Sequence, residues 1–339
     1  MRARSPITYQ LVVVAATLAS LTTIVIAMLV GQLAVSVGQV LSAFASLFGA
    51  RGESSLATTV ILEIRAPRVL AAFCVGAALA AAGAAYQNLF RNPLVSPDIL
   101  GVSSGAALGA VLGILFGMPV IAIQGAAFVG GLVAVTAIYF IGMRMRGRDP
   151  VLTLVLTGVV IGSLLGSGVA LTKYLADPFN QLPAITYWLL GSFAGVTRQE
   201  LTIALVVIGV AALPLLALRW RINLLALPDE EARALGQDIS RLRWIVILCA
   251  TLMTAASVAI CGIVGWVGLV VPHAVRLVVG AEFSRLLPIA MLVGGTFMLA
   301  VDTLGRTVAQ IEIPPGVLTA LLGAPVFLWL MAVTFRRAA

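Results

Sequence analysis

Long apolar runs separated by short polar segments fill the chain almost from end to end. A helix needs roughly 20 predominantly apolar residues to cross the bilayer core, and runs of this kind recur throughout the sequence. We predict ten spans, at residues 9–30, 69–86, 99–116, 120–143, 151–171, 201–218, 244–264, 267–280, 286–304 and 317–335. The eighth run is short and contains Pro272. We therefore expect a broken helix there, shielded from lipid by neighbouring protein.

Composition agrees with this pattern. Hydrophobic residues make up 61% of the chain and charged residues only 10%, and the mean hydropathy is +1.12. A water-soluble domain needs more charge than this on its surface. We expect an all-α polytopic membrane protein in contact with lipid, with a single transmembrane domain over residues 1–339.

The basic residues gather in alternate connections between the predicted spans. Fifteen of the 21 lie in segments 1–8, 87–98, 144–150, 219–243, 276–285 and 336–339. Cytoplasmic loops carry an excess of Lys and Arg, so this distribution predicts that both termini are cytoplasmic. The net charge of +8 is then explained by topology, and nucleic-acid binding is not needed to account for it.

Glycines recur at helical spacing in two of the predicted spans. Gly101, Gly105 and Gly109 lie four residues apart in the third span, and Gly158 and Gly162 do so in the fifth. Stripes of small residues let helix backbones approach closely in lipid. We expect these glycines to pack helices together.

A polar turn interrupts the chain just before the first stripe. It contains Asn92, Pro93, Ser96, Pro97 and Asp98. The two prolines rule out a continuous helix, and Asp98 can cap the helix that follows. From the residues alone, an ordinary cytoplasmic turn and a gate both remain open.

A longer polar segment, residues 219–244, is expected on the cytoplasmic side. A helix start is indicated by Pro228 followed by three carboxylates, those of Asp229, Glu230 and Glu231. Gly236 is expected to end this helix and Asp238 to start another. The segment is either a docking surface for a partner or a solvated connector.

Signs of catalytic chemistry are weak. A P-loop needs a lysine within a glycine-rich motif, whereas the single lysine, Lys173, lies in the sequence LTKYL. The single histidine, His273, has no metal-ligand pattern around it. We expect a protein that is not an enzyme, binds no metal or cofactor, and takes its energy from a partner or an ion gradient.

Several long motifs, in order, resemble one transporter family. They are RNPLVSPDILGVSSGAALGA, TYWLLGSFAGV, CGIVGWVGLVVPHAVRLVVG, SRLLPIAMLVGG, VDTLGR and EIPPGVLTALLGAPVFLWL. Together they resemble the FecCD-type permeases of binding-protein-dependent ABC importers for iron chelates and cobalamin. The chain departs from the family pattern at residues 282–285, Glu-Phe-Ser-Arg.

The resemblance implies the type II ABC importer fold in a bacterial cytoplasmic (inner) membrane. It also implies a second permease copy or paralogue, two ATP-binding-cassette subunits that hold ATP and Mg²⁺, and a periplasmic or lipoprotein substrate-binding protein.

The resemblance further implies roles for individual residues. One pathway constriction falls at Asn92 and Leu94, and a second at Val151 and Leu152. Coupling helices over residues 228–243 would contact the ATPase through Asp229, Glu230, Glu231, Arg233, Leu235 and Gly236. Three arginines would receive carboxylates of the binding protein: Arg65, Arg68 and Arg306. For Arg306 an ion pair with Asp302, four residues earlier, is the alternative.

The expected cargo is a metal chelate, a ferric siderophore or haem. Cobalamin and molybdate are the alternatives within the family. An ion-driven secondary carrier and a membrane receptor or scaffold are the alternatives outside it. A carrier should have carboxylates or other ion-binding groups near the membrane centre, and the sequence offers no clear set of them.

Overall fold

The computed structural model describes residues 6–31, 33, 35–46, 56–145 and 150–338. Within these residues every regular element is a helix. The first half of the chain contains α1 (Pro6–Leu29), α2 (Val37–Ser46), α3 (Leu56–Thr59), η1 (Val60–Arg65), α4 (Ala66–Leu89), η2 (Pro97–Leu100), α5 (Val102–Leu115), α6 (Val120–Arg144) and α7 (Pro150–Leu175). The second half contains α8 (Gln181–Leu190), α9 (Arg198–Ala217), α10 (Arg219–Ile222), η3 (Asn223–Ala226), α11 (Asp229–Ala234), α12 (Ile239–Cys261), α13 (Val267–Val279), α14 (Phe283–Gly305) and α15 (Pro315–Ala338).

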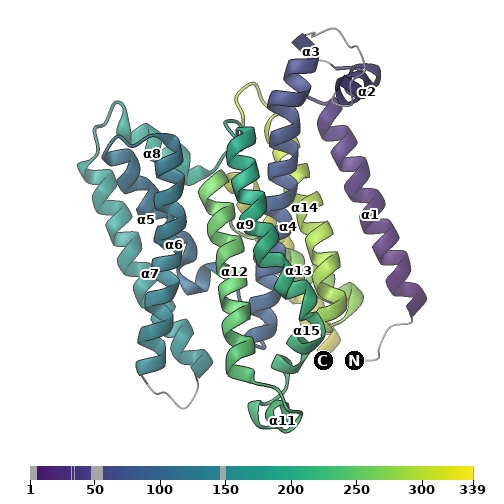
Figure 1. Cartoon of the computed structure of the whole chain (residues 1–339), viewed down its shortest axis with the longest axis vertical. Coiled ribbons are helices and arrows are strands. Elements are labelled where there is room, and N and C mark those ends of the chain that lie inside the picture. The colour runs from purple at the N-terminus through teal and green to yellow at the C-terminus, as the bar shows by residue number, and fades with distance from the viewer. Residues whose placement is uncertain (1–5, 32, 34, 47–55, 146–149, 339) are drawn as a thin grey trace.

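The prediction of about ten spans is confirmed. Eight helical stretches in the described part of the chain are long and apolar enough to cross a membrane. The shorter apolar helices α5 and α13 fall on the third and eighth predicted spans. The first residues of α1 and the last residues of α15 lie at the same end of the molecule as α11 (Figure 1).

The second span is longer than predicted. The sequence indicated a start at residue 69, because Arg65, Pro67 and Arg68 interrupt the apolar run. In the structure the helix already begins at Leu56 and continues through the π-helical turn η1 into α4. Pro67 lies just after the π-helical turn inside this continuous stretch, and as a proline it leaves one carbonyl of the preceding turn without a helical N–H donor. The two arginines are accommodated because their charges are bonded inside the protein, as described below.

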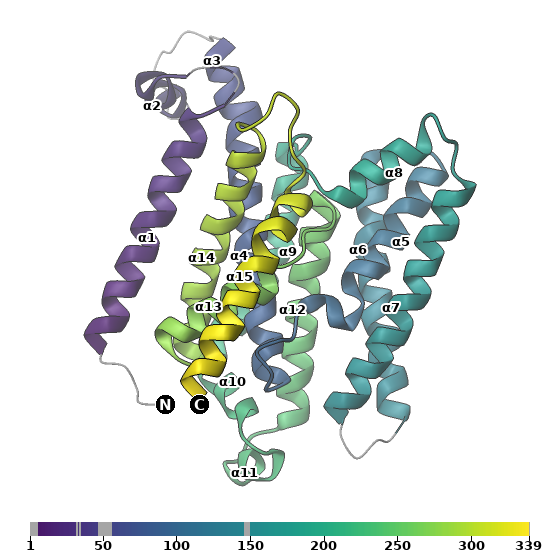
Figure 2. The ribbon, with the colours of Figure 1, turned by 180° about the vertical axis from the view of Figure 1, so that it is seen from behind.

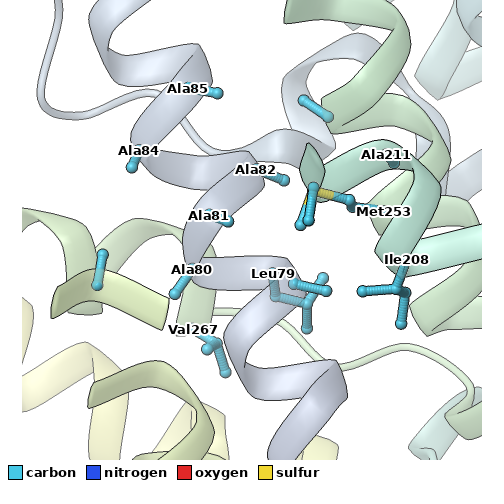
Figure 3. Close-up of a cluster of buried hydrophobic side chains, with 14 of the residues drawn as sticks. Leu79, Ala80, Ala81, Ala82, Ala84, Ala85, Ile208, Ala211, Met253 and Val267 are labelled. Atoms are coloured by element: carbon cyan, nitrogen blue, oxygen red, sulfur yellow. The ribbon is translucent and has the colours of Figure 1, made fainter. Parts of the chain in front are cut away.

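Helix α4 forms the centre of the molecule. Nearly all of its residues from Val69 to Leu89 are buried, and half of these are alanines. Figure 3 shows this alanine-rich surface facing Ile208 and Ala211 of α9, Met253 of α12 and Val267 of α13. Small side chains bring the neighbouring backbones close, since a Cβ at Gly83 would lie 1.8 Å from the carbonyl oxygen of Gly268.

The other helices are arranged around this centre. Helices α5, α6 and α7 stand together on one side, α12 lies between them and α4, and α1 lies at the opposite edge (Figure 1). Seen from behind, α15 crosses in front of the central helices, and α8 lies across the top of the α5–α7 group (Figure 2). The loop after α4 lies at the same end of the molecule as the segment between α9 and α12, which contains α11 (Figure 2).

Candidate functional site

The polar turn predicted after the second span begins with an unusual helix end. The Asn92 N–H donates to the Gln87 carbonyl at 3.1 Å, and the Arg91 N–H donates to the Asn88 carbonyl at 3.2 Å. This pair of bonds defines a Schellman cap, whose closing residue is left-handed. Here that residue is Arg91, with φ of 51°.

The two predicted gate residues of this turn are exposed. The Leu94 side chain is 43% exposed, and the side-chain amide oxygen Oδ1 of Asn92 accepts the Leu94 backbone N–H at 2.9 Å. This Asx-type bond fixes the turn locally. The turn then leads through η2 to Gly101. This residue has a φ of 67° and lies directly before the first residue of α5.

The residues predicted at the second constriction lie at the start of α7. Leu152 is 55% exposed. The side chain of Val151 lies outside the described residues, and so does that of the predicted coupling residue Asp229.

The polar segment between α9 and α12 forms the short helices that its sequence predicts. Helix α11 starts directly after Pro228, and α12 starts after Asp238, whose carboxylate accepts the Arg241 N–H at 3.0 Å. Gly236, with φ of 76°, closes the end of α11. The predicted coupling residues Glu230, Glu231, Arg233, Leu235 and Gly236 are exposed. Ala232 of the same helix is fully buried.

Side chains at the end of α4 bond to backbone carbonyls of this segment. The buried Asn88 amide donates to the Ile222 carbonyl at 2.7 Å. The Arg91 guanidinium donates to the Leu225 carbonyl through Nε at 2.9 Å, and to the Leu227 carbonyl through Nη2. The end of α4 and the predicted gate turn are therefore bonded directly to the residues that lead into the predicted coupling helices, which the sequence did not indicate.

The segment is also bonded to the start of α14. The side-chain amide oxygen Oδ1 of Asn223 accepts the Phe283 N–H at 2.6 Å. Nearby, the carboxylate of Glu282 pairs with Arg285 at 2.9 Å and accepts the Ser284 hydroxyl. These contacts involve residues 282–285, where the sequence departs from the family motif.

The predicted packing glycines differ in their surroundings. A Cβ at Gly105 would lie 2.4 Å from the Gly130 carbonyl oxygen, at Gly109 2.1 Å from that of Ala126, and at Gly158 2.1 Å from that of Ile99. A Cβ at Gly162 would lie 3.8 Å from the Ser104 hydroxyl, which is an ordinary contact. Close backbone approach therefore occurs at three of these positions, along α5–α6 and between α7 and the polar turn.

The three arginines predicted at the docking surface are mostly inside the protein. Arg65 donates to the carbonyls of Met28 at 2.7 Å, Leu29 at 3.1 Å and Leu33. Arg306 donates to the carbonyls of Val30 at 2.6 Å and Ala27. The carbonyls of Ala27, Met28 and Leu29 belong to the C-terminal end of α1, where helix carbonyls lack internal donors and the dipole favours cations, and those of Val30 and Leu33 follow directly after it. Both arginines are thus side-chain caps of α1.

Arg68 forms the ionic centre of the same cluster. Its Nη2 lies 2.9 Å from the Asp302 carboxylate, and its Nη1 lies 2.9 Å from the Glu312 carboxylate. The Asp302 side chain is only 1% exposed, whereas that of Glu312 is 33% exposed. The Arg306–Asp302 pair that the sequence offered is present at 3.7 Å. The contact between Arg68 and Glu312, which are 244 residues apart in the chain, could not be predicted from the sequence.

Comparisons with known proteins agree over nearly the whole length. A model of the FecCD transport family matches residues 17–333. The molybdate import system permease protein of Haemophilus influenzae is 40% identical over 95% of each chain. The cobalamin import system permease protein of Halobacterium salinarum is 42% identical over 83% of this chain and 75% of that protein. The hemin transport system permease protein of Yersinia pestis is 41% identical over 80% of this chain and 82% of that protein.

A solved structure is similar at the level of the fold. It is described as an inward-facing conformation of a metal-chelate type ABC transporter. The TM-score is 0.85 at 38% sequence identity, and the match covers 94% of this chain and 97% of that chain.

Proposed function

The chain belongs to the FecCD transport family and is the permease subunit of an ABC importer, and on this premise we propose that its cargo is a metal chelate, a ferric siderophore or haem. The observation that carries the proposal is the match along 94% of the chain to a metal-chelate type transporter. Neutral side chains at the predicted gates, Asn92, Leu94 and Leu152, support it, since a bulky chelate that brings its own metal ligands does not need charged groups along its path.

Molybdate is the second candidate cargo. It is supported by the Haemophilus influenzae relative named for molybdate import, which matches over 95% of both chains. An oxyanion of this kind is held by N–H donors and cationic side chains. The two candidates therefore differ in the charge that the pathway has to accept.

An ABC permease works with ATPase and substrate-binding partners. We propose that two copies of this chain, or one copy and a paralogue, enclose the pathway, with two ATP-binding-cassette subunits that hold ATP and Mg²⁺. The exposed residues of α11 and the start of α12, within residues 228–243, are the proposed ATPase contact. The proposed location is the bacterial inner membrane with both termini cytoplasmic, which is supported by the start of α1 and the end of α15 lying at the same end of the molecule as α11 (Figure 1).

The arginine cluster is the proposed contact for the binding protein. Among the described residues it combines three guanidinium groups with two carboxylates, those of Asp302 and Glu312, and so carries an excess of positive charge. Glu312 is the more exposed of the two. A carboxylate of the binding protein can therefore approach Arg68 from the side of Glu312.

Uptake into proteoliposomes tests the proposal. The vesicles contain the chain, its ATP-binding-cassette subunit and ATP inside, with the binding protein outside, and are offered ferric siderophore, haemin, cobalamin and molybdate in parallel. We expect uptake of a ferric siderophore or haemin that is lost when ATP or the binding protein is omitted. Uptake of molybdate or cobalamin alone contradicts the proposed cargo. Uptake without ATP that follows an ion gradient contradicts the importer itself.

A further inference from the structure

Three helix ends in the described part of the chain are closed by the same Schellman bond pattern. After α5, Met118 and Gly117 donate to the carbonyls of Gly113 and Ile114 at 2.9 and 3.0 Å. After α11, Gln237 and Gly236 donate to those of Ala232 and Arg233 at 3.4 and 2.9 Å. In both caps the left-handed residue is glycine, with φ of 63° and 76°. The third cap, after α4, has Arg91 at this position.

Arginine is a poor residue for this conformation. Its Cβ crowds the following carbonyl when φ is positive, a cost that glycine avoids. The backbone geometry of the α4 cap therefore gives no reason for an arginine. The reason has to come from the side chain.

The side chain of Arg91 reaches two carbonyls of the segment that leads into α11. Nε donates to Leu225 at 2.9 Å, and Nη2 donates to Leu227. A planar guanidinium can hold two acceptors in a fixed geometry, which a lysine ammonium cannot. Leu227 lies two residues before the first residue of α11, so movement of α11 displaces these acceptors.

On its other side, Arg91 is covalently joined to the predicted gate. Asn92 follows it directly, and the Asn92 side chain holds the Leu94 N–H at 2.9 Å. Arg91 therefore has a strained backbone and is bonded to the residues that lead into α11. It is also joined covalently to Asn92.

We propose that Arg91 is a positioning residue that transmits movement of α11 to the gate turn at Asn92 and Leu94. This inference rests on the proposed roles of α11 and of the gate. Asn88, which bonds Ile222 at 2.7 Å from inside the protein, holds the end of α4 against the same segment and provides the fixed point about which the turn moves.

Variants of Arg91 distinguish a role in transmitting the movement of α11 from a role in the stability of the fold. Arg91→Gly removes the two bonds to Leu225 and Leu227 but suits the left-handed backbone, so the two effects offset each other and the melting temperature is expected to stay close to that of the wild type. Arg91→Asn is the second variant, because asparagine also tolerates this conformation. Arg91→Lys keeps the charge and one bond. Arg144→Ala, at the cytoplasmic end of α6, is the control for loss of an exposed positive charge on the same side.

The first readout is the amount of ATP hydrolysed per molecule imported in proteoliposomes with the ATPase subunits and binding protein. The probe is whichever of ferric siderophore, haemin, cobalamin or molybdate the wild type imports. We expect the ratio to rise roughly two- to thirtyfold in Arg91→Gly and Arg91→Asn, the range of measured coupling effects. Arg91→Lys should lie between these variants and the wild type, and Arg144→Ala should match the wild type.

The second readout needs no cargo. Leu94→Cys, in a chain whose three native cysteines are alanine, is labelled with a maleimide in the complex with and without ATP. We expect ATP to change the labelling rate when Arg91 is present and to have little effect with Arg91→Gly. If the wild type imports no probe with ATP, the proposed function fails, and the labelling still tests Arg91.

Two results overturn the inference. One is an unchanged ratio and an unchanged response to ATP in Arg91→Gly. The other is a fall in melting temperature, ATP hydrolysis and uptake in equal proportion in both Arg91→Gly and Arg91→Asn, which would make Arg91 a purely structural residue.

Discussion

At the scale of single residues, the tightest constraints in this protein are contacts between a glycine and the backbone of another helix. Gly83 and Gly268 join α4 to α13, and Gly76 and Gly294 join α4 to α14. A backbone carbonyl cannot rotate away as a side chain can. Such positions therefore tolerate no additional atom without movement of a whole helix.

Gly83→Ala is expected to destabilise the protein by about 1–3 kcal/mol, the usual cost of overpacking a tight core. The added Cβ would lie 1.8 Å from the Gly268 carbonyl oxygen, so α4 and α13 have to separate. The measurement is the melting temperature of the purified chain in detergent.

Gly209→Ala in α9 is the matched control, because a Cβ there meets nothing within 4 Å. Alanine is a better helix former than glycine, so this variant should be neutral or more stable by up to about 1 kcal/mol. Equal melting temperatures for both variants would show that α4 and α13 are not in such close contact.

At the scale of elements, the arginine cluster determines how α1 is attached to the rest of the bundle. Many α1 side chains point away from the protein, and its C-terminal carbonyls are held by Arg65 of η1 and by Arg306 just after α14. A Cβ at Gly31 would lie 2.7 Å from Nη2 of Arg65. The absence of a side chain at Gly31 leaves room for the guanidinium groups.

Arg65→Ala is expected to loosen α1. Buried carbonyls without donors cost about 1–3 kcal/mol each, and the variant removes the donor to Met28 and Leu29. Arg198→Ala removes a half-exposed ion pair with Glu63 and exposed donors to the Leu62 carbonyl, contacts that water can replace, and a surface ion pair is worth about 0–1 kcal/mol. Limited proteolysis with a protease that cuts in the segment after α1, together with the melting temperature, should show a large change for Arg65→Ala and a small one for Arg198→Ala. Similar changes in both variants would contradict the capping role.

At the scale of the whole molecule, the polar surfaces separate into two ends. One end carries the chain termini, α11 and the gate turn, and the other carries α2, α3 and α8 (Figure 1). The arginine cluster joins α1, α4 and α14 toward the second end. The proposed contacts with the ATPase and with the binding protein therefore lie on opposite sides of the membrane.

Labelling of single cysteines checks this orientation. Asn180→Cys, just before α8, and Glu230→Cys, in α11, are introduced into a chain without native cysteines. In intact spheroplasts, a membrane-impermeant maleimide should label position 180 readily and position 230 only after the membrane is broken. The opposite pattern would mean that the chain is inserted the other way round and that the basic loops do not set its topology.

Much of this architecture was predictable from the sequence by itself, because a bilayer requires long apolar helices and basic loops mark one side of it. The number of spans followed from these requirements, and the starts of α11 and α12 followed from Pro228 and Asp238. The tertiary structure alone decided which groups meet. Arg68 bonds Glu312, Arg65 caps α1, and Arg91 adopts a left-handed backbone while it holds Leu225 and Leu227. Local patterns could not reveal these contacts, since each joins residues far apart in the chain and depends on where the folded helices bring a guanidinium group and an acceptor together.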